Sequence, residues 1–320
     1  RPSKMTAIVN NLLNVVLILV CVVFGAALLT WLERRLLGIW QDRCGPNRVG
    51  PFGTLQIAAD MIKLLMKQDW VPPFADRKIF IIAPAFAMFV VVAAFAVIPM
   101  APGVGVVDLN IGLLFFLAMT SLGVYAVMFG AYASDNKYAM LGGLRAAAQM
   151  VSYEVFMGLS LMGVVMLAGT FNLRELVLAQ ADGWFIGPQI VGFFIFFMAG
   201  IAESHRTPFD LPEAEHELTA GFHTEYSGMK FAMFFIGEYV SVLMSAAMIT
   251  VLFLGGWLGP AWLPPLMWFL LKTMALVLLM ILIRGSLPRP RYDQLMTFGW
   301  KFMLPLALLN LLITGALILI

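Results

Sequence analysis

The chain has very few of the residues that hold redox cofactors. It contains only two cysteines and three histidines among its 320 residues. Two cysteines cannot supply the four thiolates that normally bind an iron-sulfur cluster. Cys21 lies in an apolar run and Cys44 in a charged loop, so we expect no disulfide between them. A transmembrane haem requires histidines within the apolar runs, whereas the histidines of this chain share one loop, at His205, His216 and His223.

Nucleotide-binding and metal-binding motifs are absent as well. There is no P-loop, and no GxGxxG sequence leads into a helix. The glycine-containing stretch 45–51 also contains prolines, which lack the N–H groups that bind phosphate. The three histidines are spaced by 11 and 7 residues and belong to no local ligand motif. We therefore expect the chain itself to bind no redox cofactor, no metal and no nucleic acid.

Charged residues are scarce, and this sets the class of protein. They make up 12% of the chain, against 62% hydrophobic residues. A soluble fold of this length cannot bury so much apolar side chain, so we predict an all-α, polytopic membrane protein with a single domain, 1–320. Eight apolar runs approach the length that crosses about 30 Å of hydrocarbon. They are residues 8–32, 79–98, 111–133, 149–168, 185–202, 231–254, 263–283 and 302–320, and Gly187-Pro188 interrupts the fifth.

Positive charges are distributed unevenly between these runs. Sixteen Lys and Arg residues follow the odd-numbered runs, whereas Arg174 is the single one after an even-numbered run. Cytoplasmic loops carry an excess of Lys and Arg, so we expect the odd-numbered loops in the cytoplasm and both termini on the other side. The first run is too long for the core of a cleaved signal peptide. The chain begins at Arg1 rather than at methionine, and we expect further residues before it.

Residues 54–69 have the period of an amphipathic helix. Polar residues recur at spacings of four, three and four, at Gln56, Asp60, Lys63 and Lys67, and the other face is apolar. The charged residues suit the membrane interface rather than a span. Two interpretations remain open. The helix either packs on the bundle and does nothing more, or its apolar face covers a passage for an amphiphilic, lipid-soluble substrate.

Three ionisable residues lie inside the predicted spans, at Glu154, Glu238 and Lys272. A charge at the centre of a span costs roughly 2.5 to 3.5 kcal/mol, so such residues usually face a polar interior and mark an ion or proton path. Both glutamates lie about seven residues from the cytoplasmic end of their runs, which is roughly 10 Å deep. The alternative is a buried pair, or a neutral hydrogen-bonded acid, that only locks the helices together.

The loop 203–230 is acidic, although it belongs to the cytoplasmic side that is otherwise basic. Its acids are Glu203, Asp210, Glu213, Glu215, Glu217 and Glu225. Asp210 and Glu213 fit the N-cap and capping box of a short helix that Gly221 would end. Capping leaves the other four unexplained. A series of carboxylates that leads to Glu238 could pass protons between sites of similar pKa, and the histidines of the loop could join this relay.

Several strings of the sequence together match one known family. They are ERR (33–35), GPNRVGP (45–51), ADMIK (59–63), SYE (152–154), RTPFDLPEAE (206–215) and RPRYDQ (289–294). In this order, and over essentially the whole chain, they resemble the H subunit of bacterial respiratory complex I, the proton-pumping NADH:quinone oxidoreductase. The mitochondrial counterpart of this family is subunit 1 of the mitochondrial complex. The resemblance implies a membrane component that forms the ubiquinone access tunnel and couples quinone reduction to proton translocation.

The same resemblance implies partners, cofactors and a location. FMN and the iron-sulfur clusters of this family belong to partner subunits, and ubiquinone is the substrate that the tunnel admits. The partners are the hydrophilic subunits of the quinone site, the small membrane subunits at the heel of the membrane arm, and lipid. The match also implies the bacterial inner (plasma) membrane, with both termini periplasmic.

The functional residues of the family correspond to two sets in this chain. The tunnel wall corresponds to Thr30, Glu33, Arg34, Asp60 and Phe235, with Arg284 as a weaker match. The path of buried glutamates corresponds to Glu154, Glu203, Glu213, Glu215, Glu217, Glu225 and Glu238. To this path we add Asp210 from the acidic loop and Lys272 from the seventh run.

Three other functions compete with this one. The membrane component of an energy-converting hydrogenase would share the buried glutamates but bind no quinone, and the intact GPNRVGP and PRPRYDQ strings favour the quinone enzyme. A stand-alone secondary transporter would more often show inverted repeats and broken spans. A purely structural anchor leaves the cost of Glu154, Glu238 and Lys272 unexplained.

Overall fold

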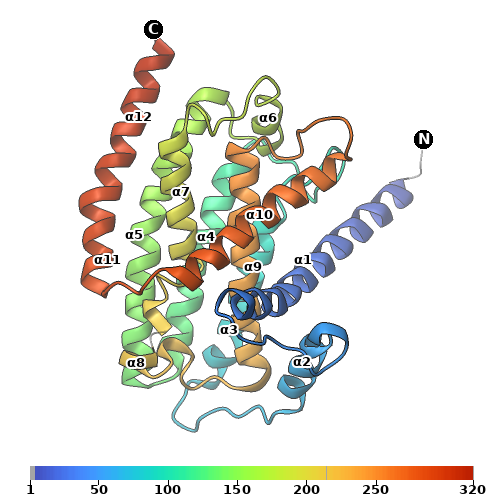
Figure 1. Cartoon of the computed structure of the whole chain (residues 1–320). Coiled ribbons are helices and arrows are strands. Elements are labelled where there is room, and N and C mark those ends of the chain that lie inside the picture. Colours follow the sequence, from blue (N-terminus) through green and yellow to red (C-terminus); the bar gives the residue numbers. More distant parts are fainter. Residues whose placement is uncertain (1–3, 214, 320) are drawn as a thin grey trace.

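The protein is a bundle of long helices (Figure 1). The computed structural model describes the backbone of residues 4–213 and 215–319, and the side chains of these residues except 4–13, 215 and 216. Within these ranges no strand occurs, and the single β-bridge joins Ala101 and Val104. The predicted all-α, polytopic membrane class is confirmed, because the spans satisfy their backbone hydrogen bonds within each helix, as hydrocarbon requires.

Seven helices in the described part of the chain are long and apolar enough to cross a membrane. Six of them are α1 (Lys4–Trp40), α3 (Arg77–Phe95), α4 (Gly112–Ala133), α5 (Lys137–Ala168), α9 (Gly228–Phe253) and α10 (Pro265–Ser286). The seventh covers Tyr292–Leu319 and consists of α11 (Tyr292–Phe298), the π-helical turn η4 (Gly299–Met303) and α12 (Leu304–Leu319).

The fifth predicted span differs from the helix that the structure has there. The prediction was residues 185–202, but α7 begins after the Gly187-Pro188 interruption and covers Ile190–Glu203, only 14 residues. A full crossing needs about 20. The preceding Gln189 is buried, and its amide bonds Asn310 and Thr314 of α12 at 2.8 and 2.6 Å. This polar contact fixes the start of α7 inside the bundle.

Helix α9 forms the centre of the bundle. It packs against α1, α3, α7 and α10, and 78% of its most apolar stretch is buried, against 22% for α1 and for the last span. In a membrane the close approach of helices depends on small residues rather than on the hydrophobic effect. A Cβ on Gly200 of α7 would lie 3.2 Å from the Cβ of Ser245 in α9. The exposed apolar side chains of α1 and α12, at opposite edges of Figure 1, suit lipid or partner helices.

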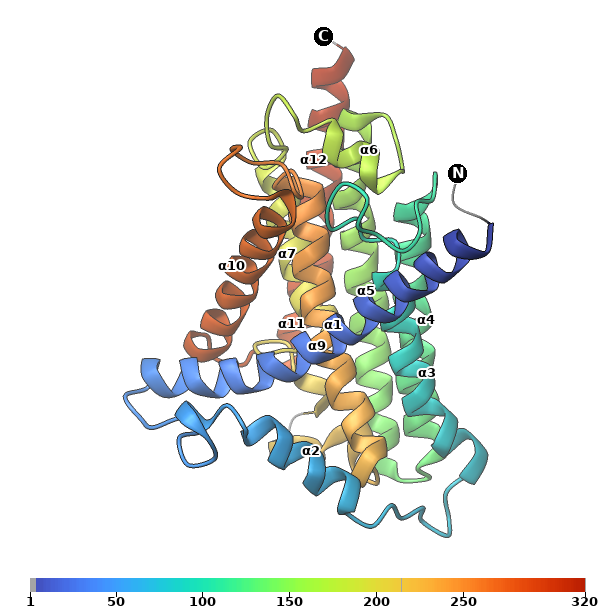
Figure 2. The same cartoon turned by 90° about the vertical axis from the view of Figure 1, so that its right-hand side faces the viewer.

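The segment predicted as an amphipathic helix contains α2 (Gln56–Met66), which packs against α1 and α9. Figures 1 and 2 place α2 at the opposite end of the bundle from the beginning of α1, the end of α12 and the short helix α6 (Leu173–Leu178). The acidic loop lies at the same end as α2 and contains η2 (Leu211–Glu213), α8 (Glu215–Leu218) and η3 (Gly221–His223). The two features that the sequence singled out therefore share one end of the molecule.

Candidate functional site

A cavity of about 170 Å³ lies between α1, α2 and α9, and we call it the α2 cavity. Four of the six predicted tunnel residues line it, namely Thr30, Arg34, Asp60 and Phe235. Most of the remaining wall is apolar, with Ala27, Ile57, Met61, Leu64, Phe231, Ala232 and Ile236. Helix α2 presents both apolar and charged side chains to this cavity, namely Ile57, Asp60, Met61, Lys63 and Leu64, whereas its apolar Ile62, Leu65 and Met66 are exposed.

The charged part of this wall is an ion pair between two helices. Arg34 Nη1 of α1 donates to Asp60 Oδ2 of α2 at 2.7 Å, and Gln56 Nε2 donates to Asp60 Oδ1 at 2.9 Å. The Arg34 and Asp60 side chains are 46% and 28% exposed, so the pair contributes at most about 1 kcal/mol to stability. Its place in a cavity wall gives it a second possible use, as a polar contact for a ligand.

The other two predicted tunnel residues, Glu33 and Arg284, line a separate small cavity of about 20 Å³. Glu33 lies on a different face of α1 from Arg34 and is buried. Arg284 of α10 donates to Glu33 Oε1, and the Arg206 guanidinium lies 3.9 Å from Glu33 Oε2. Arg206 and Tyr239 complete the polar wall of this cavity, which we call the Arg206 cavity.

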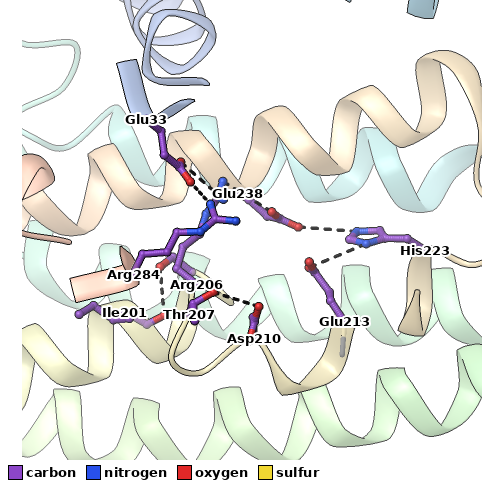
Figure 3. Close-up of polar contacts among 10 residues, drawn as sticks. Glu33, Ile201, Arg206, Thr207, Asp210, Glu213, His223, Glu238 and Arg284 are labelled. Atoms are coloured by element: carbon purple, nitrogen blue, oxygen red, sulfur yellow. Dashed lines mark hydrogen bonds and ion pairs between the residues drawn. The ribbon is translucent and has the colours of Figure 1, made fainter. Parts of the chain in front are cut away.

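Arg206 lies between the tunnel residue Glu33 and the buried Glu238. Its Nη2 is 3.7 Å from Glu238 Oε2 (Figure 3). Its guanidinium carbon lies 3.9 Å from the centre of the Tyr239 ring. The backbone N–H of Arg206 donates to Ile201 O at 3.4 Å, which attaches the residue to the end of α7. A single buried cation is thus shared by a carboxylate of α1 and a carboxylate of α9.

Beyond Arg206 the structure groups four side chains that we call the acid cluster, namely Asp210, Glu213, His223 and Glu238 (Figure 3). The His223 ring lies between two carboxylates, with Nδ1 3.8 Å from Glu213 Oε1 and Nε2 3.7 Å from Glu238 Oε1. Burial and the proximity of His205 lower the pKa of His223 to about 3, so its ring is neutral. Burial and the neighbouring Glu238 raise the pKa of Glu213.

Asp210 corrects one interpretation of the acidic loop. It was a candidate N-cap with Glu213 as its capping-box partner, but Asp210 Oδ2 accepts from Thr207 Oγ1 at 3.0 Å and from Arg289 Nη2 at 2.6 Å. The Glu213 carboxylate faces His223 instead. The side chains of both acids therefore bind other side chains rather than form a local cap, and Arg289 connects the loop to the chain beyond α10.

Glu203 and Glu154 extend the series of acids into the bundle. Glu203, at the end of α7, is buried and lines a third cavity of about 70 Å³ together with Glu238, Thr120, His205 and Ser241. Glu154 of α5 accepts a hydrogen bond from Ser121 Oγ of α4. Its carboxylate is close enough to Glu203 for the two to interact electrostatically. Glu154, Glu203 and Glu238 thus follow one another across α5, α7 and α9.

Three other predicted path residues lie away from this series. Glu217 pairs with Arg145 of α5, and Glu225 accepts from Asn136 Nδ2 at 2.7 Å. Lys272 donates to the carbonyls of Leu254, Gly256 and Leu258 at 2.6, 3.1 and 2.6 Å and lies 4.5 Å from the centre of the Trp184 ring. The three carbonyl contacts of Lys272 hold the loop 254–258, which lies at the end of the bundle remote from α2. The side chain of Glu215 lies outside the described residues.

Sequence reasoning missed the groups that connect these acids. Arg206 was named only within the RTPFDLPEAE string, the histidines were given no specific partners, and neither Tyr239 nor Ser121 was assigned a role. His223 and Glu238 are 15 residues apart and belong to η3 and α9, so no spacing rule brings them together. The only available signal was local. Arg206 opens the RTPFDLPEAE string, and Tyr239 follows Glu238 directly.

The acid cluster also meets the spacing of a metal site. Ligand atoms of Glu213, His223 and Glu238 lie within 4.8 Å of one another. However, His223 turns its two nitrogens toward different carboxylates, and the Arg206 cation lies 3.7 Å from Glu238. The positive charge of Arg206 would repel a divalent metal ion bound by these three residues. The absence of a metal from the native site stays a prediction.

The sequence is similar to known proteins over nearly its full length. The family model described as NADH dehydrogenase matches residues 13–315. The H subunit of the NADH-quinone oxidoreductase of Methylococcus capsulatus is 62% identical over 299 residues, which cover 93% of this chain and 95% of that protein. Both matches include α2, the acidic loop and every helix that contributes to the three cavities.

Proposed function

Because the chain belongs to the family of the H subunit, a membrane component of the NADH-quinone oxidoreductase known as respiratory complex I, we propose that it forms a ubiquinone access tunnel and couples quinone reduction to proton translocation. The α2 cavity supports the tunnel. It offers an apolar wall for an isoprenoid tail and a polar contact at Arg34 and Asp60 for a headgroup. Its volume is below the several hundred Å³ of a ligand pocket, so we propose that partner subunits complete it.

The observation that carries the coupling is the position of Arg206, 3.9 Å from Glu33 and 3.7 Å from Glu238. Reduction of a quinone to a quinol takes up two electrons and two protons, and side chains of the tunnel wall that supply these protons become more negative. Any change in the charge at Glu33 alters its attraction for Arg206, and Arg206 is also the counter-charge of Glu238. We propose that this shared cation carries the signal from the tunnel to the buried acids.

From Glu238 the proposed proton path continues in two directions. One leads through the Glu203 cavity to Glu203 and Glu154. The other leads to Glu213 and Asp210 of the acidic loop. Glu217 and Glu225 lie on the outer side of that loop, where protons could enter. We leave Lys272 off the path, because its ammonium group is bound to three carbonyls.

The proposed setting follows from the family and from the missing cofactor ligands. FMN and the iron-sulfur clusters belong to partner subunits, and ubiquinone enters from the lipid. The hydrophilic partners would contact the end that carries α2 and the acidic loop, because the positive-inside rule places that end in the cytoplasm. The small membrane subunits and lipid would cover the exposed helices of the bundle, with both termini periplasmic.

Two experiments test this function in the whole complex in native membranes. Glu154→Gln and Glu238→Gln should each lower proton translocation driven by NADH and quinone, while the complex still assembles. Wild-type translocation in both variants would refute the path. A photoreactive quinone should label α1, α2 or α9 of this chain, and labelling confined to other subunits would refute the tunnel.

A further inference from the structure

His223 has a position that the sequence did not predict. Its imidazole is the only side chain in the described part of the chain that lies between two carboxylates of the acid cluster, with one ring nitrogen toward each (Figure 3). The side chain is 7% exposed. Glu213 belongs to η2 and Glu238 to α9, so His223 contacts both the acidic loop and the membrane helix at the place where oxygens of the two carboxylates lie within 4.8 Å of each other.

Close backbone packing fixes Glu213 and His223 relative to each other. Gly221 begins η3 with φ of 57°, and a Cβ there would lie 1.8 Å from Pro212 O, directly before Glu213. A Cβ on Gly142 of α5 would lie 2.8 Å from Gly221 Cα. Only glycine permits these contacts. They hold η3 against η2 and α5, so Glu213 and His223 keep their relative positions.

Several atoms where His223 meets the two carboxylates have no hydrogen-bond partner. They are His223 Nε2, Glu238 Oε1 and Glu213 Oε1, and all three are shielded from solvent. Buried polar atoms without partners are costly and rare in folded proteins, so they call for an explanation. The distances of 3.7 and 3.8 Å exceed a hydrogen bond by about half an ångström. A small movement of either carboxylate would therefore close a bond to the ring.

We infer that His223 is a proton carrier that joins Glu238 to Glu213. The inference rests on the proposed proton path and adds a residue to it. A protonated Glu238 gives its proton to Nε2, and the imidazolium so formed gives the proton on Nδ1 to the Glu213 carboxylate. One O–H bond breaks and one forms, and the ring ends as the other neutral tautomer. Rotation of the ring, or transfer in the reverse direction, restores the first tautomer.

The surroundings of the ring suit such a carrier. Because burial lowers the pKa of His223 to about 3, the ring is neutral at rest and can both accept and donate a proton. The charged and titratable groups that face it are Glu213, Glu238 and His205, with Arg206 on the far oxygen of Glu238. The rest of the contact is aromatic, from Phe222, Phe231 and Phe234. These rings exclude bulk water and so prevent loss of the proton.

The test compares two substitutions of equal size in the full complex in native membrane vesicles. His223→Gln keeps a polar side chain but cannot carry a proton, whereas His223→Glu has the same shape as the glutamine variant and can. We expect NADH-driven proton translocation to fall about tenfold or more in His223→Gln, and His223→Glu to recover a large part of it. A merely structural histidine would not distinguish the two. The amount of assembled complex on native gels normalises each rate.

Arg174→Gln, which lies off the proposed path, is the control. Arg174 of α6 pairs with Asp108 at 3.7 Å, and neither residue lines any of the three cavities described above. We expect this variant to translocate protons like the wild type. If His223→Gln does not assemble, His223→Asn, whose amide is smaller, takes its place in the comparison.

Two results would overturn the inference. One is wild-type translocation in His223→Gln while Glu238→Gln is inactive, which would leave the proposed path intact without the histidine. The other is an equal loss in His223→Gln and His223→Glu at normal assembly, which would make the ring a packing element. Wild-type translocation in Glu154→Gln and Glu238→Gln as well would instead refute the proposed function.

Discussion

The Arg206 guanidinium lies 3.9 Å from the centre of the Tyr239 ring. Because Tyr239 follows Glu238 in α9, one turn of this helix supplies both an aromatic face and a carboxylate to the same cation. An arginine can stack on a ring and pair with carboxylates at the same time, since its guanidinium is planar. Arg206 is therefore held in place from the α9 side even when its attraction to Glu33 changes.

Replacing Arg206 should uncouple the tunnel from the acids. In Arg206→Gln, Glu33 and Glu238 lose their common counter-charge, and a coupling energy of about 1.4 kcal/mol or more, a factor of ten, should be lost. We expect proton translocation per NADH oxidised to fall, as measured in vesicles with a pH-sensitive dye. Breaking a buried pair also costs about 3–5 kcal/mol, so assembled complex must be quantified.

Arg174→Gln is the control for this substitution. Arg174 forms a pair with Asp108 at 3.7 Å, but both side chains are more than half exposed and lie at the end opposite α2. We expect normal translocation in this variant. An Arg206→Gln complex that translocates as well as Arg174→Gln would contradict the coupling role.

The ion pair in the wall of the α2 cavity should affect quinone binding more than stability. Asp60→Asn removes the charge that holds Arg34 and Gln56. Since the pair is partly exposed, we expect thermal stability to change by at most about 1 kcal/mol. The KM for a soluble quinone should rise several-fold with a smaller change in kcat. Asp108→Asn, at the opposite end of the bundle, should leave the KM unchanged, and an equal KM in both variants would argue against a quinone at α2.

Lys272 is expected to act on stability rather than on the proton path. In Lys272→Met the carbonyls of Leu254, Gly256 and Leu258 lose a charged donor, at a cost of about 3 kcal/mol or more. Thermal denaturation of the purified complex should show a lower midpoint. The protons translocated per NADH should stay normal in the assembled fraction. A normal midpoint with a reduced proton ratio would return Lys272 to the path.

Acid should destabilise the protein partly through its buried histidines. Burial and the adjacent Arg206 lower the pKa of His205 to about 4, whereas its ordinary value is about 6.5. Between these values the unfolded chain binds a proton that the folded chain does not, so stability falls as the pH falls. Glutamine does not titrate. His205→Gln should therefore lose less of its thermal midpoint than the wild type between about pH 7 and about pH 5.

Glu213 contributes with the opposite sign. Its pKa is raised in the folded state, so it binds protons more readily there and favours folding as the pH falls. This contribution is common to the wild type and His205→Gln and cancels in their comparison. Identical pH profiles for the two proteins would show that folding does not shift the pKa of His205.

The family membership also decides between the functions that competed at the sequence level. The 62% identity to an H subunit of the quinone enzyme, over 95% of that protein, leaves no observation in favour of an energy-converting hydrogenase or a stand-alone transporter. Asp210 and Glu213 show how local patterns mislead. Their spacing fits a capping box, yet Asp210 binds Arg289, 79 residues away, and Glu213 faces His223 on a different element of the loop. Local rules compete with tertiary contacts, and here the tertiary contacts prevail.

The sequence by itself determined the membrane class, the amphipathic helix and the helical spans except the fifth, because hydrophobic length and period act locally along the chain. It also marked Glu154 and Glu238 as costly charges. Only the tertiary structure decided that Glu33 turns away from the α2 cavity and meets Arg206, that His223 lies between Glu213 and Glu238, and that Lys272 is bound by carbonyls. Contacts between residues on different helices depend on how the helices pack, and no short-range pattern records that packing.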